Sequence, residues 1–214
     1  GRMNFSAAIF DLDGTLADSN SVWKKIDIIL LQRRGIKCSD ALADSLASMT
    51  YEDAFAEMQQ LGVKDSFQEV IKEFNELAAD EYRHNIFLKD YAVEYLTYLK
   101  GQGIKIALAT ASPKELYEPV LRHNHAYGYF DAFCTTDEAG RSKDHPDIYL
   151  LAASKLGVPP NECVVFEDVL KGIVSAKNAG MTAVGVYDKY SAEDIVTIRA
   201  SADKFIMNFS EMMK

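Results

Sequence analysis

Two aspartates, Asp11 and Asp13, directly follow the short apolar segment Ala7–Phe10 in the run AAIFDLDGTLADS. Side chains two positions apart on an extended segment point to the same side, so both carboxylates should emerge together, and Gly14 allows a sharp exit. Two like charges held together cost free energy unless a cation or a shared proton relieves them. The pair indicates either a cation site or an Asp-rich turn, and partners elsewhere in the chain must decide between them.

Polar residues also end two later apolar segments. KIALATAS ends with Thr110 and Ser112, and Pro113 then opens a helical pattern whose free amides could hold phosphate oxygens, although a simple N-cap is the alternative. CVVFED ends with Glu167 and Asp168. Ligands gather at the carboxyl ends of strands in a parallel sheet, and four converging acids without a cation would be strongly destabilised. Because oxygen ligands suit magnesium, the acids predict a Mg²⁺ site.

A lysine in a loop could balance this acidic site. Lys143 lies in GRSKDHPDIY, ahead of a helical pattern that Pro146 helps to start. A lone loop lysine is usually a solvated surface charge, so its neighbours in the fold decide its role.

The elements that position these residues fall into two patterns. From Lys105 onward, continuous apolar strand-like segments alternate with helical ones, which predicts a parallel sheet covered on both faces. Residues 20–84 instead read as amphipathic helices with Ser, Thr or Asp starts. We therefore predict an α/β fold: a Rossmann-like parallel-sheet core domain of residues 1–18 and 86–214, with helices on both faces and an inserted all-helical cap domain of residues 19–85.

Composition limits the function classes. The 214 residues are 48% hydrophobic and 26% charged, which is ordinary for a globular protein. The net charge of -9 argues against a nucleic-acid or anionic-membrane partner. Three cysteines without a C-x-x-C pattern predict reduced core residues, and four histidines without ligand spacing argue against zinc. No signal peptide or membrane-length apolar run is found, which predicts the cytoplasm.

Together these motifs resemble the haloacid dehalogenase-like hydrolases, specifically the branch with a helical cap that contains small phosphatases and beta-phosphoglucomutase. The resemblance covers essentially the whole chain, and all of its motifs occur in the family's order. Two positions depart from the family pattern: Asp144 stands where a proline is common, and Val169 where a serine is common. The matching residues are DLDGT (Asp11, Asp13, Thr15), TAS (Thr110, Ser112), Lys143 and FEDVLKGIVSAKNAGM (Glu167, Asp168, Gly172, Ala176, Ala179, Gly180).

The resemblance implies roles for the acids. Asp11 would attack phosphorus and form an aspartyl-phosphate, while Asp13 would protonate the leaving oxygen and then activate water. Magnesium would be held by Asp11, by the backbone carbonyl of Asp13 and by Asp168. Glu167 would support the ion directly or through water.

The remaining motif residues would bind the phosphoryl group. The resemblance implies that Thr110, the Ala111 amide and Ser112 hold its oxygens, and that Lys143 pairs with both the phosphate and Asp11. Dehalogenases and phosphonate-cleaving relatives lack an aspartate at the place of Asp13, so its presence argues for phosphate esters. The expected substrate is a small phosphorylated metabolite.

Several functions compete at this point. The preferred one is a Mg-dependent phosphatase for a small phosphomonoester; the alternative is a sugar-phosphate mutase of the beta-phosphoglucomutase type. Mutases that the chain resembles carry cationic residues where this chain has Trp23 and, in the loop SMTYED, Thr50 or Tyr51. Less favoured are a two-component receiver domain, whose acidic pair is adjacent in sequence, and a catalytically silent interaction protein. The SMTYED loop and Trp23 are candidates for substrate specificity, with ordinary cap packing as the alternative for Trp23.

Overall fold

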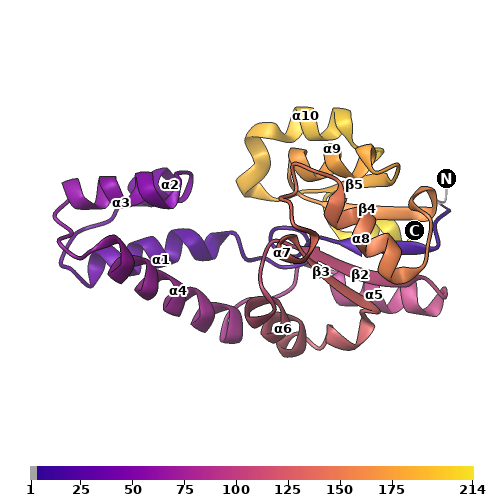
Figure 1. Ribbon diagram of the computed structural model, residues 1–214, viewed down its shortest axis with the longest axis horizontal. Coiled ribbons are helices and arrows are strands. Elements are labelled where there is room, and N and C mark those ends of the chain that lie inside the picture. Colours follow the sequence, from indigo (N-terminus) through magenta and orange to yellow (C-terminus); the bar gives the residue numbers. More distant parts are fainter. Residues whose placement is uncertain (1–3) are drawn as a thin grey trace. The chain divides into compact units, whose positions relative to one another are not determined.

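The sheet of the protein is built from parallel strands. Within residues 4–214, which the computed structural model describes, six strands follow the order β3-β2-β1-β4-β5-β6, and every neighbouring pair is parallel (Figure 1). The predicted parallel α/β sheet is confirmed. The strands are β1 (Ala7–Phe10), β2 (Lys105–Thr110), β3 (Ala132–Thr135), β4 (Cys163–Glu167), β5 (Thr182–Val186) and β6 (Lys204–Ile206).

Strand β1 lies at the centre of the sheet, and its four residues are all fully buried. Its last residue, Phe10, pairs in register with Leu108 of β2 on one side and with Phe166 of β4 on the other. The residues that follow these three positions therefore leave the sheet at the same edge. This register explains why acids far apart in the sequence meet in one place.

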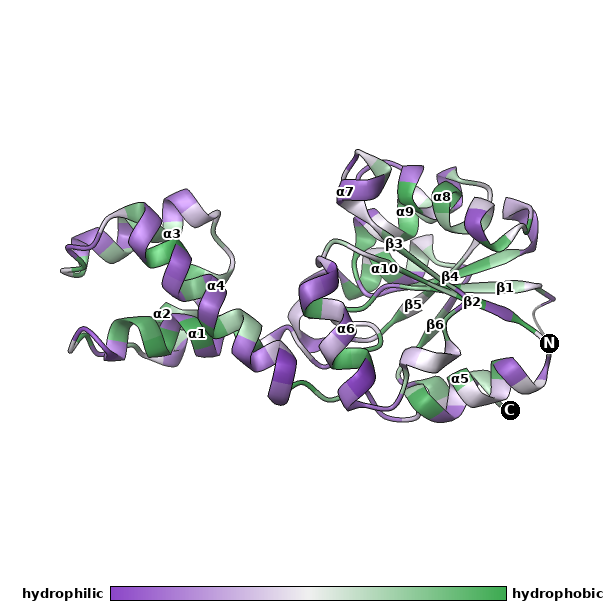
Figure 2. Cartoon of the chain, turned by 60° about the horizontal axis from the view of Figure 1, so that its bottom comes forward, coloured by the Kyte–Doolittle hydropathy of each residue, from purple (hydrophilic) through white to green (hydrophobic). Residues whose placement is uncertain are grey.

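Side chains of β1 alternate between two faces of the sheet, and both faces are covered. Ile9 belongs to a core cluster with Tyr149 and Ile173, while Phe10 stacks on Phe166 with ring centroids 4.7 Å apart and meets Tyr95 edge-on at 6.2 Å. The central strands accordingly carry the hydrophobic colours of Figure 2. A strand covered on both sides needs a continuous apolar run, which is what AAIF supplies.

Helices surround this sheet in the chain order expected for alternating strands and helices. Strand β6 and helix α5 lie outside the segments singled out from the sequence; β6 has only three residues, two of them half-buried, so it lacks a strong apolar pattern. The elements are α5 (Ala92–Gly101), α6 (Lys114–His123), η1 (Tyr127–Tyr129), α7 (Thr136–Ala139), α8 (Asp147–Leu156), η2 (Pro160–Glu162), α9 (Leu170–Asn178), η3 (Lys189–Asp194), α10 (Ile195–Ser201) and η4 (Phe209–Met212).

The remaining segment is entirely helical. Its helices are α1 (Ser21–Gln32), α2 (Asp40–Ala47), α3 (Tyr51–Gln60) and α4 (Phe67–His84). Ser39, Thr50 and Ser66 each accept a hydrogen bond from a backbone N–H in the first turn of the helix that follows, and Ser66 forms a capping box with Glu69. These caps are the helix starts that the sequence pattern predicts.

The chain divides into two compact units, one running up to Asp18 and resuming at Ile86, the other comprising Ser19–Asn85. Within the first unit, the Asp18 N–H donates a hydrogen bond of 2.9 Å to the Phe87 carbonyl. The role of residues 19–85 as a cap domain stays a prediction, and the first three residues of the predicted core domain lie outside the described residues. Within residues 4–214, no helix is both long and apolar enough to cross a membrane.

Candidate active site

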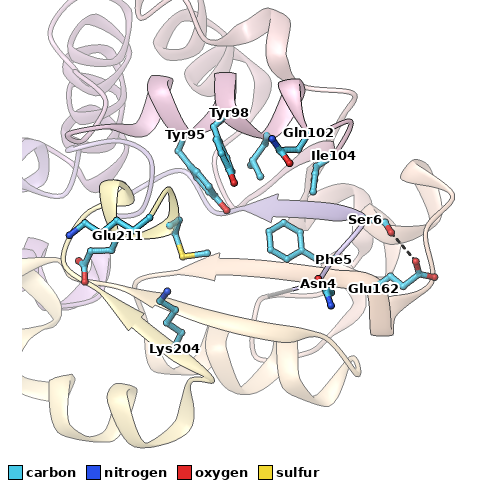
Figure 3. A pocket seen from close by; sticks show the side chains of 13 residues that line it. Asn4, Phe5, Ser6, Tyr95, Tyr98, Gln102, Ile104, Glu162, Lys204 and Glu211 are labelled. Atoms are coloured by element: carbon cyan, nitrogen blue, oxygen red, sulfur yellow. Dashed lines mark hydrogen bonds between the residues drawn. The ribbon is translucent and has the colours of Figure 1, made fainter. Parts of the chain in front are cut away.

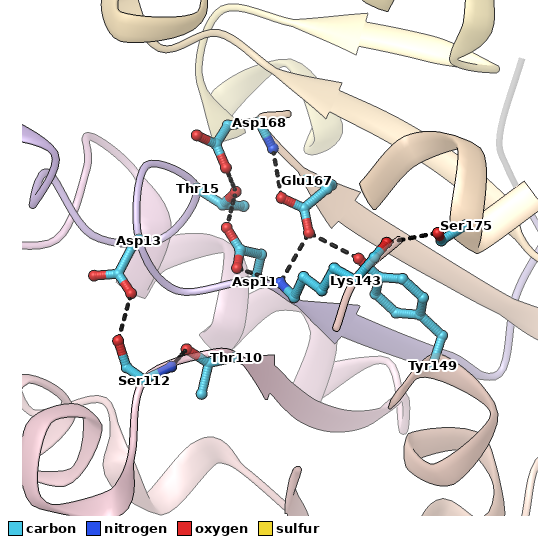
Figure 4. Close-up of polar contacts among 10 residues, drawn as sticks. All are labelled: Asp11, Asp13, Thr15, Thr110, Ser112, Lys143, Tyr149, Glu167, Asp168 and Ser175. Carbon is cyan, nitrogen blue, oxygen red and sulfur yellow. Dashed lines mark hydrogen bonds and ion pairs between the residues drawn. The ribbon is translucent and has the colours of Figure 1, made fainter. Parts of the chain in front are cut away.

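Three carboxylates meet at the carboxyl ends of β1 and β4. Asp11 follows β1, Glu167 ends β4 and Asp168 comes next, and one oxygen from each lies within 4.8 Å of the others (Figure 4). All three residues are buried. The parallel pairing of β1 with β4 is therefore what brings the two acidic motifs together.

Lys143 joins this cluster from the loop before α8. Its ammonium contacts the carboxylate of Asp11 and lies 2.9 Å from Glu167 Oε2, and its side chain is only 7% exposed. Lys143 is thus a buried counter-charge and not a solvated surface lysine. The neighbouring Asp144, which departs from the family pattern, is exposed and accepts a hydrogen bond from the Ser142 hydroxyl at 3.1 Å.

Two further buried side chains hold Lys143 and Glu167 in place, and sequence reasoning missed both. The Tyr149 hydroxyl donates to Glu167 Oε2 at 2.8 Å, and the Ser175 hydroxyl donates to the backbone carbonyl of Lys143 at 2.6 Å. Both belong to the helices α8 and α9, where they stand on otherwise apolar buried faces. A polar residue on such a face is a weak signal, because tyrosine and serine often fill that place without a role at a site.

The charges of the cluster do not balance. Burial and the charge of Glu167 raise the pKa of Asp11 to about 7, and burial together with Asp11 and Glu167 raises the pKa of Asp168 well above its usual value. Burial disfavours the charged forms of Lys143 and Glu167. The attraction of Asp11 and Glu167 nevertheless raises the pKa of Lys143, and the attraction of Lys143 lowers the pKa of Glu167. The raised pKa values of Asp11 and Asp168 mean that these two acids tend to hold a proton between them. A bound cation could take the place of that proton.

Thr15 links the two acids whose pKa values are raised. Its hydroxyl oxygen lies 2.9 Å from Asp11 Oδ2 and 3.0 Å from Asp168 Oδ1. The single hydroxyl hydrogen of Thr15 can be donated to either carboxylate or shared between them. Thr15 thus holds Asp11 and Asp168 next to each other at the carboxyl ends of β1 and β4.

A carboxylate donor set of this kind fits magnesium. Hard divalent cations prefer oxygen ligands, and a cation displaces protons from the carboxylates that bind it. Of the three acids, Glu167 is the most fully engaged: Oε2 accepts from Lys143 and Tyr149, and Oε1 accepts from the Asp168 N–H at 3.2 Å. Asp11 and Asp168 are therefore better placed than Glu167 to be direct ligands.

Asp13 turns its carboxylate toward the end of β2. The Ser112 hydroxyl donates to Asp13 Oδ2 at 2.8 Å, and the Ser112 N–H donates to Thr110 Oγ1 at 3.0 Å (Figure 4). Thr110 is fully buried and Ala111 is exposed between them. The structure thus brings the second aspartate together with the hydroxyl pair, while its side chain is not a member of the three-acid cluster.

The turn after Asp13 is anchored by a residue that sequence reasoning missed. Gly14 has φ = 82°, a conformation that glycine adopts without strain, and its carbonyl accepts a hydrogen bond from the ammonium of Lys89. Lys89 also donates to the Tyr187 carbonyl at 2.9 Å and pairs with buried Asp188 at 3.0 Å. The pair of Lys89 and Asp188 ties this turn to the end of β5.

A separate pocket of about 450 Å³ lies at the other edge of the sheet (Figure 3). It is lined in part by Phe5 and Ser6 just before β1, by Ile104 just before β2 and by Glu162 just before β4. These positions are at the amino ends of parallel strands. Since ligands of parallel sheets bind at the carboxyl ends, where the buried acids lie, this pocket is not the candidate active site.

Comparison with known proteins identifies the family. The family model for haloacid dehalogenase-like hydrolases matches residues 5–180. Validoxylamine A 7'-phosphate phosphatase from Streptomyces hygroscopicus subsp. limoneus is 29% identical over 208 residues, covering 97% of this chain and 96% of that protein. Hexitol phosphatase B from Escherichia coli (strain K12) is 33% identical over 185 residues, covering 84% and 82%.

A solved structure agrees with these matches. A protein from Thermotoga maritima with the provisional name beta-phosphoglucomutase superposes with a TM-score of 0.82 at 28% identity, covering 94% of each chain. The predicted enzyme class, a phosphoric monoester hydrolase, is confirmed by relatives that are themselves named phosphatases. With its strand-end acids, its buried lysine and a family match over most of its length, the chain belongs to the haloacid dehalogenase-like hydrolases.

Proposed function

We propose that this enzyme is a magnesium-dependent phosphatase that hydrolyses a small phosphorylated metabolite through an aspartyl-phosphate on Asp11. The observation that supports it most is the buried contact of Lys143 with Asp11 and Glu167 at the carboxyl ends of β1 and β4. A carboxylate beside a fixed ammonium can approach a phosphate dianion that it would otherwise repel. Asp13, hydrogen-bonded to Ser112, supplies the second acid that ester hydrolysis requires.

The chemistry assigns one step to each aspartate. A carboxylate oxygen of Asp11 forms a bond to phosphorus while the bond from phosphorus to the ester oxygen breaks, and Asp13 gives that oxygen its proton. Asp13 then takes a proton from water, which attacks phosphorus and releases Asp11. Thr110, the Ala111 amide, Ser112 and Lys143 bind the phosphoryl oxygens during both steps.

Magnesium would be held by Asp11, Asp168 and the backbone carbonyl of Asp13. When bound, it offsets the negative charge that gathers on the phosphoryl oxygens. Glu167 is assigned a supporting role, through water or through Lys143, because both of its oxygens already accept hydrogen bonds.

The substrate class is proposed from the relatives. Validoxylamine A 7'-phosphate phosphatase, hexitol phosphatase B and a phosphorylated carbohydrates phosphatase from Thermotoga maritima are named for phosphate esters of polyhydroxylated compounds. We propose the same class, a sugar or polyol monophosphate, for this enzyme. The cytoplasm stays the predicted compartment.

Chelation is expected to remove activity. In excess EDTA, release of inorganic phosphate from hexitol monophosphates should fall by about a hundredfold or more, because the clustered acids repel a phosphate dianion. Added Mg²⁺ should restore the rate, whereas added Na⁺ at equal ionic strength should not. Full activity in excess chelator would contradict a metal-dependent site.

A mutase is the second candidate, because the Thermotoga maritima structure carries that provisional name. A mutase must hold a second phosphate, which requires cationic side chains. In the helical unit, Trp23 stacks on Phe74 with centroids 5.7 Å apart, and Thr50 accepts a hydrogen bond from the Asp53 N–H at 3.1 Å. Neither Trp23 nor Thr50 is cationic, so water is favoured as the acceptor.

The two lysines near Trp23 have other partners. Lys24 pairs with Asp44 at 3.2 Å, and Lys25 pairs with Glu81 at 2.7 Å. The assay that separates the two functions supplies beta-glucose 1-phosphate with a catalytic amount of the bisphosphate. Conversion to glucose 6-phosphate that is much faster than phosphate release from any tested ester would favour the mutase.

Replacing Lys89 tests whether its contact with the Gly14 carbonyl helps to position Asp13. Lys89→Met keeps most of the side-chain stem but loses the contacts with Gly14 and Asp188, so we expect kcat to fall by about tenfold while KM changes little. Lys177→Met is the matched control, since it removes a 2.7 Å pair with Asp203 at the surface. A folded Lys89→Met enzyme with unchanged kcat would show that the anchor does not position Asp13.

A further inference from the structure

The pocket of about 450 Å³ at the amino ends of the strands has no role in the proposed function (Figure 3). Its volume is in the range of small-molecule sites. Phe5, Leu99 and Ile104 give it apolar walls, while Tyr95 of α5 and Lys204 of β6 bring polar groups into it. Neither polar group has a hydrogen-bond or ion-pair partner in the part of the chain that the structure describes, and this points to a ligand.

Tyr95 is the unusual member of the lining. It is only 1% exposed, and its ring stacks on Phe209 with centroids 5.6 Å apart and meets Phe166 edge-on at 5.5 Å. Within residues 4–214, every fully enclosed side-chain nitrogen or oxygen has a hydrogen-bond partner, so the unpartnered Tyr95 hydroxyl must open onto the pocket. Because the packed ring fixes its direction, this hydroxyl cannot turn to an acceptor elsewhere in the protein.

A buried hydroxyl without a hydrogen bond costs free energy of folding, and a phenylalanine ring would fill the same place in the core. Burial, with a smaller effect of Tyr98, raises the pKa of Tyr95 above its usual value, so the hydroxyl keeps its proton. The Tyr95 hydroxyl is therefore available to donate a hydrogen bond to a molecule in the pocket.

The charged groups of the lining indicate what that molecule is. Lys204 is half-buried and extends from β6 toward α5 (Figure 3). The two acids of the lining are already engaged: Glu162 Oε1 accepts from the Ser6 hydroxyl at 2.8 Å, and Glu211 Oε2 accepts from the Asn208 N–H at 3.2 Å. The ammonium without a partner therefore favours a ligand that accepts hydrogen bonds and carries negative charge.

A single negative charge fits this lining better than two, because Glu162 and Glu211 would repel the second charge of a phosphate dianion. We infer that the pocket binds a small organic monocarboxylate. Its carboxylate pairs with Lys204 and accepts from the Tyr95 hydroxyl, and its apolar part lies against Phe5. The pocket is at the edge of the sheet opposite the buried acids, so the inference stands independently of the proposed phosphatase activity.

Three probes of similar shape and different charge test the inference. We would measure binding of benzoate, uncharged benzamide and cationic benzylamine to the intact protein by equilibrium dialysis at a pH of about 7, where a carboxylic acid is ionised. Benzoate should bind saturably and about tenfold or more tightly than benzamide. Equal binding of these two probes, tighter binding of benzylamine, or no saturable binding of benzoate would overturn the proposal.

A lysine variant and its control locate the bound probe. Lys204→Met keeps most of the side-chain stem and removes the ammonium, so it should lower the benzoate affinity to that of benzamide. Lys171→Met makes the same change at an exposed position of α9 outside the pocket lining, and it should leave the benzoate affinity unchanged. The melting temperature of each free variant verifies that it is folded. Benzoate binding at wild-type strength in folded Lys204→Met would refute the assigned site.

Tyr95→Phe separates a ligand contact from a purely structural role of the hydroxyl. The variant loses only the unpartnered hydroxyl, so the melting temperature of the free protein should stay the same or rise, while the benzoate affinity should fall severalfold. A hydroxyl that only supported the fold would show the reverse, a lower melting temperature with unchanged benzoate affinity, and that result would contradict the proposal.

Discussion

Asp11→Asn is expected to reduce turnover by about ten-thousand-fold or more, because an amide oxygen cannot replace the carboxylate as the nucleophile toward phosphorus. The variant should still fold. Burial is the main cause of the raised pKa of Asp168, but the charge of Asp11 adds to it, so removing that charge lessens the repulsion on Asp168 while Lys143 keeps Glu167 as its partner. Steady-state release of phosphate and the melting temperature together measure the two effects.

A phosphoryl-labelled substrate tests the covalent step itself. Wild-type protein quenched during turnover should carry label, and Asp11→Asn should carry none. Asp13→Asn should still capture the phosphoryl group but release it slowly, since it lacks the base that activates water. Asp137→Asn, an exposed aspartate on α7, is the matched control and should behave as wild type. Label on Asp11→Asn at the wild-type level would place the nucleophile elsewhere.

Gly172→Ala is expected to disrupt the buried ion pair of Lys143 and Glu167. A Cβ added at Gly172 would lie 2.2 Å from Cγ of Glu167 and 2.5 Å from its Oε2, so the Glu167 side chain must move. Its contacts with Lys143 and Tyr149 would then be lost. Breaking a buried charge pair costs about 3–5 kcal/mol of unfolding free energy, and activity should fall by about a hundredfold or more.

Gly101→Ala is the matched control for this substitution. Gly101 ends helix α5, and a Cβ there would meet no atom within 4 Å. The control should therefore be neutral or slightly stabilising, because alanine loses less conformational freedom on folding than glycine. Denaturant unfolding and phosphate release measure both variants. If Gly172→Ala were as stable and as active as Gly101→Ala, the position of Glu167 would not matter to the site.

The sequence predicts those parts of the fold and the site whose signals are local. An apolar run followed at once by acids marks the ends of β1 and β4, and this pattern also predicts that Asp11 and Asp168 approach each other in a parallel sheet. The three-residue strand β6 carries too few residues for a periodic pattern. Its place beside β5 depends on tertiary packing, which no short window of sequence contains.

The residues that hold the site in place lack such local signals. Lys89 lies 75 positions from the Gly14 carbonyl that it contacts, and Tyr149 and Ser175 stand on apolar helix faces. Each gains its role only when the sheet brings distant segments together. A buried lysine also contradicts the usual expectation for its residue type, so Lys143 could be interpreted only together with its acidic neighbours.

Two backbone hydrogen bonds, from the Asp18 N–H to the Phe87 carbonyl and from the Lys89 N–H to the Leu16 carbonyl, have a consequence for the order of folding. Strand β1 pairs with β2 although their partners Ala7 and Lys105 are roughly a hundred positions apart, so closing this pairing in an unstructured chain carries a large entropy cost. The intervening helices have local contacts and their own caps, which allow them to form early. Folding of Ser19–Asn85 would bring the flanking residues Asp18 and Phe87 close together, at the hydrogen-bond distance that they have in the folded protein. We therefore expect the helical unit to speed assembly of the sheet by shortening the effective loop between its two central strands.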